Sequence, residues 1–215
     1  MGYDWADRLV HVPYGTVSIN GAKLATRTGN VVLLKDLFAQ AVEKARAITA
    51  EKNPNLENLD RVAESVGVGA IIFHYLMNNR MRDINFILED ALSFDGNTGP
   101  YAQYTYARTA SILEKAGDTG EMTVYDMNEA EIGLVKTLAI FPEAVKNALS
   151  DYEPSVITRY ILDLCASFNR FYHDCQIITC PEPTVRKARI AMTAATHTVL
   201  GRALSLICMK KTERI

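Results

Sequence analysis

The chain has 215 residues, long enough for one large domain or two small ones with real cores. Hydrophobic residues make up 48% of it, charged residues 22%, and its formal net charge is −2, which describes an ordinary soluble globular protein and gives no overall sign of a nucleic-acid partner. No apolar run approaches the length of a membrane span, so no membrane partner is expected.

The cysteines argue against a metal site. Cys165, Cys175, Cys180 and Cys208 show no Cys-x-x-Cys spacing. His173 is the nearest histidine that would join them, but the irregular spacing favours reduced, structural thiols. The sequence therefore predicts no metal and a cytoplasmic protein.

The positive charge is concentrated near the C-terminus. The cations there are Arg186, Lys187, Arg189, Arg202, Lys210, Lys211 and Arg214, opposed in that stretch only by Glu213. A local basic surface matters more for RNA contact than the net charge. A solvated helix face explains the same run equally well.

The first thirty residues predict short strands. Residues 9–12 and 15–19 have extended patterns, Asn20-Gly21 is a hairpin signal, and residues 31–34 are a possible further strand. Residues 23–30 (KLATRTGN) form a polar loop with two cations and a glycine. Such a loop suits closure over a polyphosphate, although an exposed hairpin tip has the same composition.

The following region predicts helices at residues 35–51, 56–66 and 68–77, with the last two interrupted at Gly67-Val-Gly69. A short strand at 83–87 and a single helical turn at 88–92 follow.

The rest of the chain reads as helix. Thr98 is suited to cap a helix with Pro100 in its first turn and no breaker before Gly117. Further helices are predicted from Asn128, with a restart at Phe141-Pro142 up to residue 149, and over residues 154–174 and 184–207. Helices joined by short links predict an antiparallel bundle.

One face of the helix after Thr98 carries Tyr101, Tyr104 and Arg108. Aromatic rings interleaved with cations suit base stacking and phosphate contact. Tyrosines that merely cover the core give the same pattern, and the pattern alone favours that interpretation.

Residues 97–108 (NTGPYAQYTYAR) closely resemble the segment that joins the catalytic domain to the anticodon-binding helical domain in arginyl-tRNA synthetases. Residues 168–175 (FNRFYHDC), 188–191 and 199–204 resemble the anticodon domain of the same family. Residues 11–17, 23–30 and 31–34 resemble its version of the second class I signature, usually Lys-Met-Ser-Lys-Ser. Here Lys23 matches the first lysine, whereas Thr26 replaces the second lysine and Arg27 the last serine.

The resemblance implies a mainly α protein. Residues 1–100 would be a helix-rich part of the catalytic domain with a few short strands, and residues 101–215 a DALR-type helical anticodon-binding domain. The chain has no His-Ile-Gly-His-like signature and no strand–helix nucleotide fold. It is therefore expected to be the C-terminal portion of an arginine-tRNA ligase, inactive by itself.

The resemblance also implies partners and site residues. The full-length enzyme would use ATP with magnesium and arginine, and this portion would bind arginine tRNA as a monomer. Lys23, Thr26 and Arg27 are the expected catalytic-loop residues. The expected tRNA-binding residues are Tyr101, Gln103, Tyr104, Arg108, Asn169, Tyr172, His173, Arg186, Arg189 and Arg202.

Two other functions remain open: a stand-alone, non-catalytic RNA-binding helical module, and a helical interaction protein that has lost RNA binding. The loop at residues 23–30 weakly favours a portion of a working enzyme, because a pure RNA-binding module has no use for it.

Overall fold

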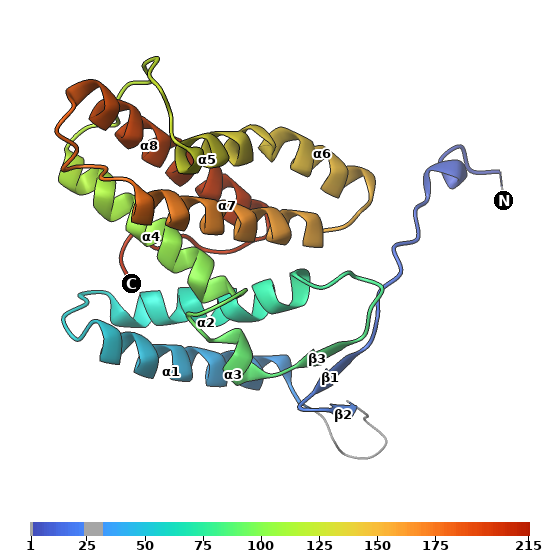
Figure 1. Cartoon of the computed structure of the whole chain (residues 1–215). Helices are drawn as coiled ribbons and strands as arrows, with labels where there is room; N and C mark the ends of the chain where they lie inside the picture. The colour runs from blue at the N-terminus through green and yellow to red at the C-terminus, as the bar shows by residue number, and fades with distance from the viewer. Residues whose placement is uncertain (1, 24–31) are drawn as a thin grey trace.

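A computed structural model describes residues 2–23 and 32–215. A bundle of helices lies over a smaller layer that contains two long helices and a small sheet, and the N-terminal segment extends away from both (Figure 1). The mainly α fold class predicted from the sequence is confirmed.

The extended N-terminal segment contains the 3₁₀ helix η1 (Ala6–Arg8) (Figure 1). The elements of the smaller layer are β1 (Val17–Ile19), β2 (Ala22–Lys23), α1 (Leu34–Lys52), α2 (Leu59–Leu76), β3 (Ile84–Phe86) and α3 (Leu88–Ala91). The sheet order is β2-β1-β3, with β1 antiparallel to β2 and parallel to β3. Asn20 and Gly21 have φ values of 50° and 76°, as a tight hairpin between β1 and β2 requires.

Two strand predictions in this layer are wrong. Residues 9–12 belong to no strand and lie exposed, because no neighbouring strand pairs with them among the described residues. Val32 and Leu33 are not a strand either, and α1 begins directly after them at Leu34.

The predicted break at Gly67-Val-Gly69 is also wrong, because α2 runs through both glycines. A Cβ added to Gly67 would lie 2.8 Å from the backbone of Ala41, and one on Gly69 would lie 3.1 Å from Nε2 of Gln103. The glycines therefore allow α1 and α4 to approach α2 closely.

The bundle consists of α4 (Gly99–Ala116), α5 (Glu129–Ala139), α6 (Phe141–Ser150), α7 (Ser155–Asp174) and α8 (Pro183–Leu206). The predicted start of α4 is confirmed, since the Thr98 hydroxyl accepts from the Tyr101 N–H at 3.2 Å. Asn128 and Glu131 form the predicted capping box of α5. Gly117, with φ of 74°, ends α4.

Helix α2 belongs to both hydrophobic cores. Its Phe73 lies in the bundle core and its Ile71 in the core shared with α1 and β3. The expected division between residues 100 and 101 falls inside the first turn of α4.

Candidate nucleic-acid interface

Half of the ten residues predicted to contact RNA meet on one surface, between α4 and α7. Tyr101, Tyr104 and Arg108 share one face of α4 because their spacing matches the helical period. Asn169 and Tyr172 come from α7, which packs beside α4. We call these five residues the α4–α7 cluster.

Arg108 occupies the centre of the cluster. Its guanidinium carbon lies 5.0 Å from the ring centroid of Tyr104 and 5.0 Å from that of Tyr172. The rings are 42% and 46% exposed, so each combines a contact to Arg108 with surface open to solvent. Cation–π attraction favours this stacked arrangement.

Asn169 connects the cluster to the body of α4. Its Oδ1 accepts from Nη1 of Arg108 at 2.5 Å, and its Nδ2 donates to the Tyr101 hydroxyl at 2.8 Å. Nδ2 also lies 3.4 Å from the hydroxyl of Thr105, which donates to the Tyr101 carbonyl at 3.0 Å. Sequence reasoning missed Thr105, although its spacing of four residues from Tyr101 was a usable signal.

The charge of Arg108 is not neutralised by the protein. Among the residues that the structure describes, no carboxylate forms an ion pair with Arg108. A half-buried guanidinium that contacts two rings and has no carboxylate partner among the described residues suits an anionic or acceptor-rich ligand.

His173 follows the cluster at the end of α7. Its side chain is 88% exposed, and its Nδ1 lies 2.9 Å from Oδ1 of Asp174. That hydrogen bond lowers the pKa of the Asp174 carboxyl. His173 is open to a ligand. Among the described residues, its side chain forms no hydrogen bond with a member of the α4–α7 cluster.

Gln103 is not on this surface. Its side chain is fully buried, and its Nε2 donates to the carbonyls of Ser65 at 3.1 Å and Lys210 at 2.9 Å. The amide joins α4 to α2 and to the C-terminal segment. Burial therefore removes Gln103 from the set of residues expected to touch RNA.

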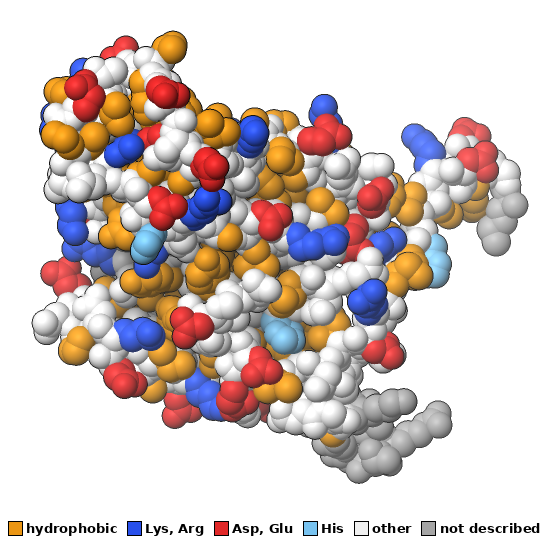
Figure 2. Space-filling view, in the orientation of Figure 1, with side chains coloured by type: hydrophobic (Ala, Val, Ile, Leu, Met, Phe, Trp, Pro, Cys, Tyr) orange, Lys and Arg blue, Asp and Glu red, His pale blue; other side chains and the backbone are white. Residues whose placement is uncertain are grey.

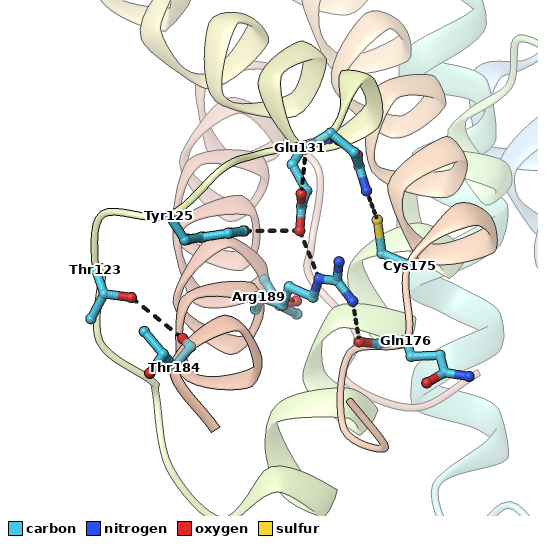
Figure 3. Close-up of polar contacts among 9 residues, drawn as sticks. Thr123, Tyr125, Glu131, Cys175, Gln176, Thr184 and Arg189 are labelled. Atoms are coloured by element: carbon cyan, nitrogen blue, oxygen red, sulfur yellow. Dashed lines mark hydrogen bonds and ion pairs between the residues drawn. The ribbon is translucent and has the colours of Figure 1, made fainter. Parts of the chain in front are cut away.

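Arg189 is also held inside the protein (Figure 3). Its side chain is 14% exposed, its Nε donates to Oε1 of the buried Glu131 at 2.6 Å, and its Nη1 donates to the Gln176 carbonyl at 2.9 Å. Tyr125 donates to the same Glu131 oxygen at 2.8 Å. These contacts join α5 to α8, so Arg189 is a structural cation and not the phosphate contact expected from the sequence.

Burial raises the cost of ionising Glu131, but the hydrogen bonds that it accepts outweigh this effect. The donors are Arg189, the backbone N–H of Asn128 and the Tyr125 hydroxyl, and together they hold the pKa of Glu131 below its ordinary value. Burial is the first cause of the raised pKa of Tyr125, followed by its bond to Glu131. We call Tyr125, Glu131 and Arg189 the α5–α8 cluster.

The remaining predicted phosphate contacts lie apart on α8. Arg186 is half-buried near the start of the helix, and Arg202 is exposed near its end. At a rise of about 1.5 Å per residue they are separated by roughly 24 Å. The structure does not bring them together as one site.

The catalytic-loop residues are described only in part. Lys23 ends β2, and Thr26 and Arg27 lie outside the described residues. Within the described ranges, no group of three or more His, Cys, Asp or Glu side chains could hold a metal ion. No helix in those ranges is long and apolar enough to cross a membrane.

Two hollows lie away from the α4–α7 cluster. One, of about 210 Å³, is lined by His74 and Asp90 beside the start of α4. The other is an apolar groove of about 470 Å³ between α1, α2 and the end of α8. Figure 2 shows charged side chains of both signs spread over one face of the molecule, with apolar side chains exposed between them.

Two family models give the class of the protein. Residues 102–215 match the family model described as "DALR anticodon binding domain". Residues 1–88 match the model described as "tRNA synthetases class I (R), catalytic domain". The protein is therefore of the class I aminoacyl-tRNA synthetase type.

The relatives narrow this class to one family. The chain is 44% identical over 217 residues to an arginine–tRNA ligase of Clostridium botulinum and 42% identical over 222 residues to one of Alkaliphilus metalliredigens. Both matches include the whole of this chain, but the chain spans only 38% of the length of each relative. The chain belongs to the arginyl-tRNA synthetase family.

Solved structures agree with this assignment. The arginyl-tRNA synthetase of Thermus thermophilus matches 95% of this chain with a TM-score of 0.86 at 33% identity, and the chain covers 35% of that protein. The enzyme of Plasmodium falciparum matches 95% of the chain with a TM-score of 0.77 at 25% identity, again with 35% of that protein covered.

Proposed function

We propose that this chain is the tRNA-binding, C-terminal portion of an arginine–tRNA ligase, and that the α4–α7 cluster receives unpaired bases of the anticodon loop. The observation that carries the proposal is Arg108, stacked between two half-exposed tyrosines with no carboxylate partner among the described residues. The division into a catalytic part before residue 101 and an anticodon part after it belongs to the same proposal.

The cluster offers two kinds of contact. The exposed ring of Tyr104 would stack on a base that is splayed out of the loop, and such a stack contributes roughly 1–3 kcal/mol. The Tyr172 ring also stacks with Phe168, so it would meet a base with the part that stays exposed. The N–H groups of Arg108 would donate to base or phosphate oxygens. Arg186, Arg202 and His173 remain proposed as outer contacts, and they would appear mainly as a salt dependence of binding.

ATP with magnesium and arginine are proposed as ligands of the whole ligase. The contribution of this chain would come from the loop at residues 23–30, where Lys23 and Arg27 supply positive charge and Thr26 replaces a lysine. Because the described residues offer no cluster for a metal ion, we assign no metal ligand to them. The protein is proposed to be cytoplasmic and monomeric.

A non-catalytic RNA-binding module is the second candidate. It is favoured by the location of the cluster, which is built entirely from α4 and α7 and uses no residue of the small sheet. In that case RNA binding would be the only activity of the chain.

Two measurements on the purified chain test these proposals. A titration with an arginine tRNA transcript should show binding that weakens when the anticodon bases are changed. ATP–pyrophosphate exchange with arginine should stay at background. Equal binding of both transcripts would contradict the anticodon assignment, and exchange above background would show that the chain is catalytic by itself.

A further inference from the structure

The amide of Asn169 is already engaged at both ends. Its oxygen accepts from Arg108, and its nitrogen donates to Tyr101 and lies within reach of Thr105. An asparagine side chain offers two N–H donors and two acceptor lone pairs; both donors and one lone pair are used here, so one lone pair remains for any further partner. The residue type alone suggests an amide that reads base edges, whereas these contacts face the protein.

The hydrogen bond to Asn169 fixes the direction of the Arg108 N–H groups, which the contacts with the two tyrosine rings do not determine. Tyr104 and Tyr172 each hold the guanidinium carbon of Arg108 at 5.0 Å from a ring centroid, but these contacts do not determine the direction of its N–H groups. The 2.5 Å hydrogen bond from Nη1 to Asn169 determines it. The other guanidinium N–H groups of Arg108 make no hydrogen bond to the described residues.

The hydroxyl of Tyr101 in turn holds Asn169, because Nδ2 donates to it. A phenol hydroxyl can donate or accept, so the direction of the amide is set by Arg108, which only donates and therefore faces the amide oxygen. A reversed amide would place two donors face to face. The order Tyr101, Asn169, Arg108 is thus a chain of hydrogen bonds that ends on the unpaired cation.

We propose that Asn169 is a positioning residue, which presets Arg108 between Tyr104 and Tyr172 for acceptor atoms of an unpaired nucleotide and does not itself touch the RNA. This inference rests on the proposed function. Presetting a long side chain removes the loss of rotamer freedom that binding would otherwise cost. Asn169 would therefore act only through Arg108.

A double-mutant cycle on the full chain tests this dependence. Arginine tRNA transcript is titrated against the wild type, Arg108→Ala, Asn169→Ala and the double variant, with thermal unfolding recorded for each. Arg108→Ala should weaken binding by about tenfold, which is about 1.4 kcal/mol. Asn169→Ala should weaken binding by a smaller factor, and the double variant should bind no more weakly than Arg108→Ala.

Two further variants separate positioning from a general effect on folding. Tyr101→Phe removes the hydroxyl that holds the Asn169 amide in place, so it should weaken binding in the wild-type background and have no effect in Asn169→Ala. Asn169→Asp keeps an acceptor for Arg108 but places a negative charge beside the guanidinium, which offsets its positive charge. The slope of log K for tRNA binding against log salt concentration should therefore decrease by about the contribution of one phosphate contact. Arg170→Ala, on the same helix and ion-paired with Glu129 and Asp174, is the matched control and should bind as the wild type does.

The outcomes distinguish this inference from the proposed function. If Arg108→Ala weakens binding but Asn169→Ala does not, or if the two losses add in the double variant, the positioning role is overturned while anticodon binding stands. If the wild type does not bind the transcript, or Arg108→Ala binds equally well, both proposals are overturned.

Discussion

Two arginines in the same bundle have opposite environments. Arg189 in the α5–α8 cluster is 14% exposed and donates to a carboxylate that is itself 1% exposed. Arg108 in the α4–α7 cluster is also half-buried, but it contacts two tyrosine rings and donates to a neutral amide. The first guanidinium has its charge satisfied by the protein, and the second has it available for a ligand.

This difference separates structural cations from functional ones better than sequence position does. Removing a member of the α5–α8 cluster leaves a buried group without a partner, so the expected loss is in folding. Removing a member of the α4–α7 cluster leaves its partners in contact with solvent, so the expected loss is in RNA binding. Each of the following changes tests one side of this contrast.

The largest effect is expected for Glu131→Ala. Arg189 would keep its charge at a nearly buried position without a carboxylate, which typically costs about 3–5 kcal/mol of folding free energy. Urea unfolding of the variant measures this. Glu129→Ala, on the same helix but with a side chain 92% exposed, is the control and should change stability by less than about 1 kcal/mol. Equal effects of the two changes would contradict the contrast.

The next largest loss of stability is expected for Tyr125→Phe, and Tyr172→Phe, which also removes only a hydroxyl, is its comparison. Tyr125→Phe removes the 2.8 Å hydrogen bond to the buried Glu131 and should cost about 1.5–3 kcal/mol of stability. Tyr172→Phe keeps the ring that contacts Arg108, so both stability and tRNA affinity should stay within about 0.5 kcal/mol of the wild type. Unfolding curves and tRNA titrations check both. A large binding loss in Tyr172→Phe would mean that the hydroxyl, not the ring, meets the RNA.

Arg108→Lys is expected to have a smaller effect. Lysine keeps the positive charge but loses the planar group that stacks between the tyrosines, a contribution of about 0.5–1 kcal/mol at an exposed site. Affinity for arginine tRNA should fall accordingly, while the salt dependence of binding stays unchanged because the charge is retained. A changed salt slope with unchanged affinity at low salt would show that stacking is irrelevant.

The smallest expected effect is the pH dependence of the stability that Glu131 contributes. The pKa of Glu131 in the folded chain is held below its ordinary value of 4.5. Its contribution to stability is therefore complete above the unfolded-state pKa and is lost as the pH falls through the folded-state pKa. The stability difference between wild type and Glu131→Gln should be largest near neutral pH and narrow below about pH 4.5. A difference that widens in acid would contradict the lowered pKa.

Local signals in the sequence were sufficient for most of the helices. Thr98 with Pro100, and Asn128 with Glu131, specify helix starts through short-range hydrogen bonds, and both starts are confirmed. Gly67 and Gly69 misled because a glycine can break a helix or admit a neighbouring one, and only the positions of α1 and α4 decide between these roles.

The candidate site was predictable where local periodicity determines which residues share a helix face. It was not predictable where contacts with distant segments decide burial. The periodicity of α4 places Tyr101, Tyr104 and Arg108 on one face, and the structure puts Tyr104 and Arg108 in contact. Gln103 and Arg189 were assigned to RNA because their types suit it, yet their partners come from segments distant in sequence. A run of cations does not reveal which members have a buried carboxylate.

Helix α2 has a further consequence, because it serves both cores. Phe73 packs into the bundle, Ile71 packs against the smaller layer, and Gln103 bonds α4 to the Ser65 carbonyl of the same helix. Among the described residues, buried contacts join the two layers through α2, so α4 cannot rotate on α2 without breaking them. An RNA bound as proposed at the α4–α7 cluster would therefore keep one orientation relative to the small sheet.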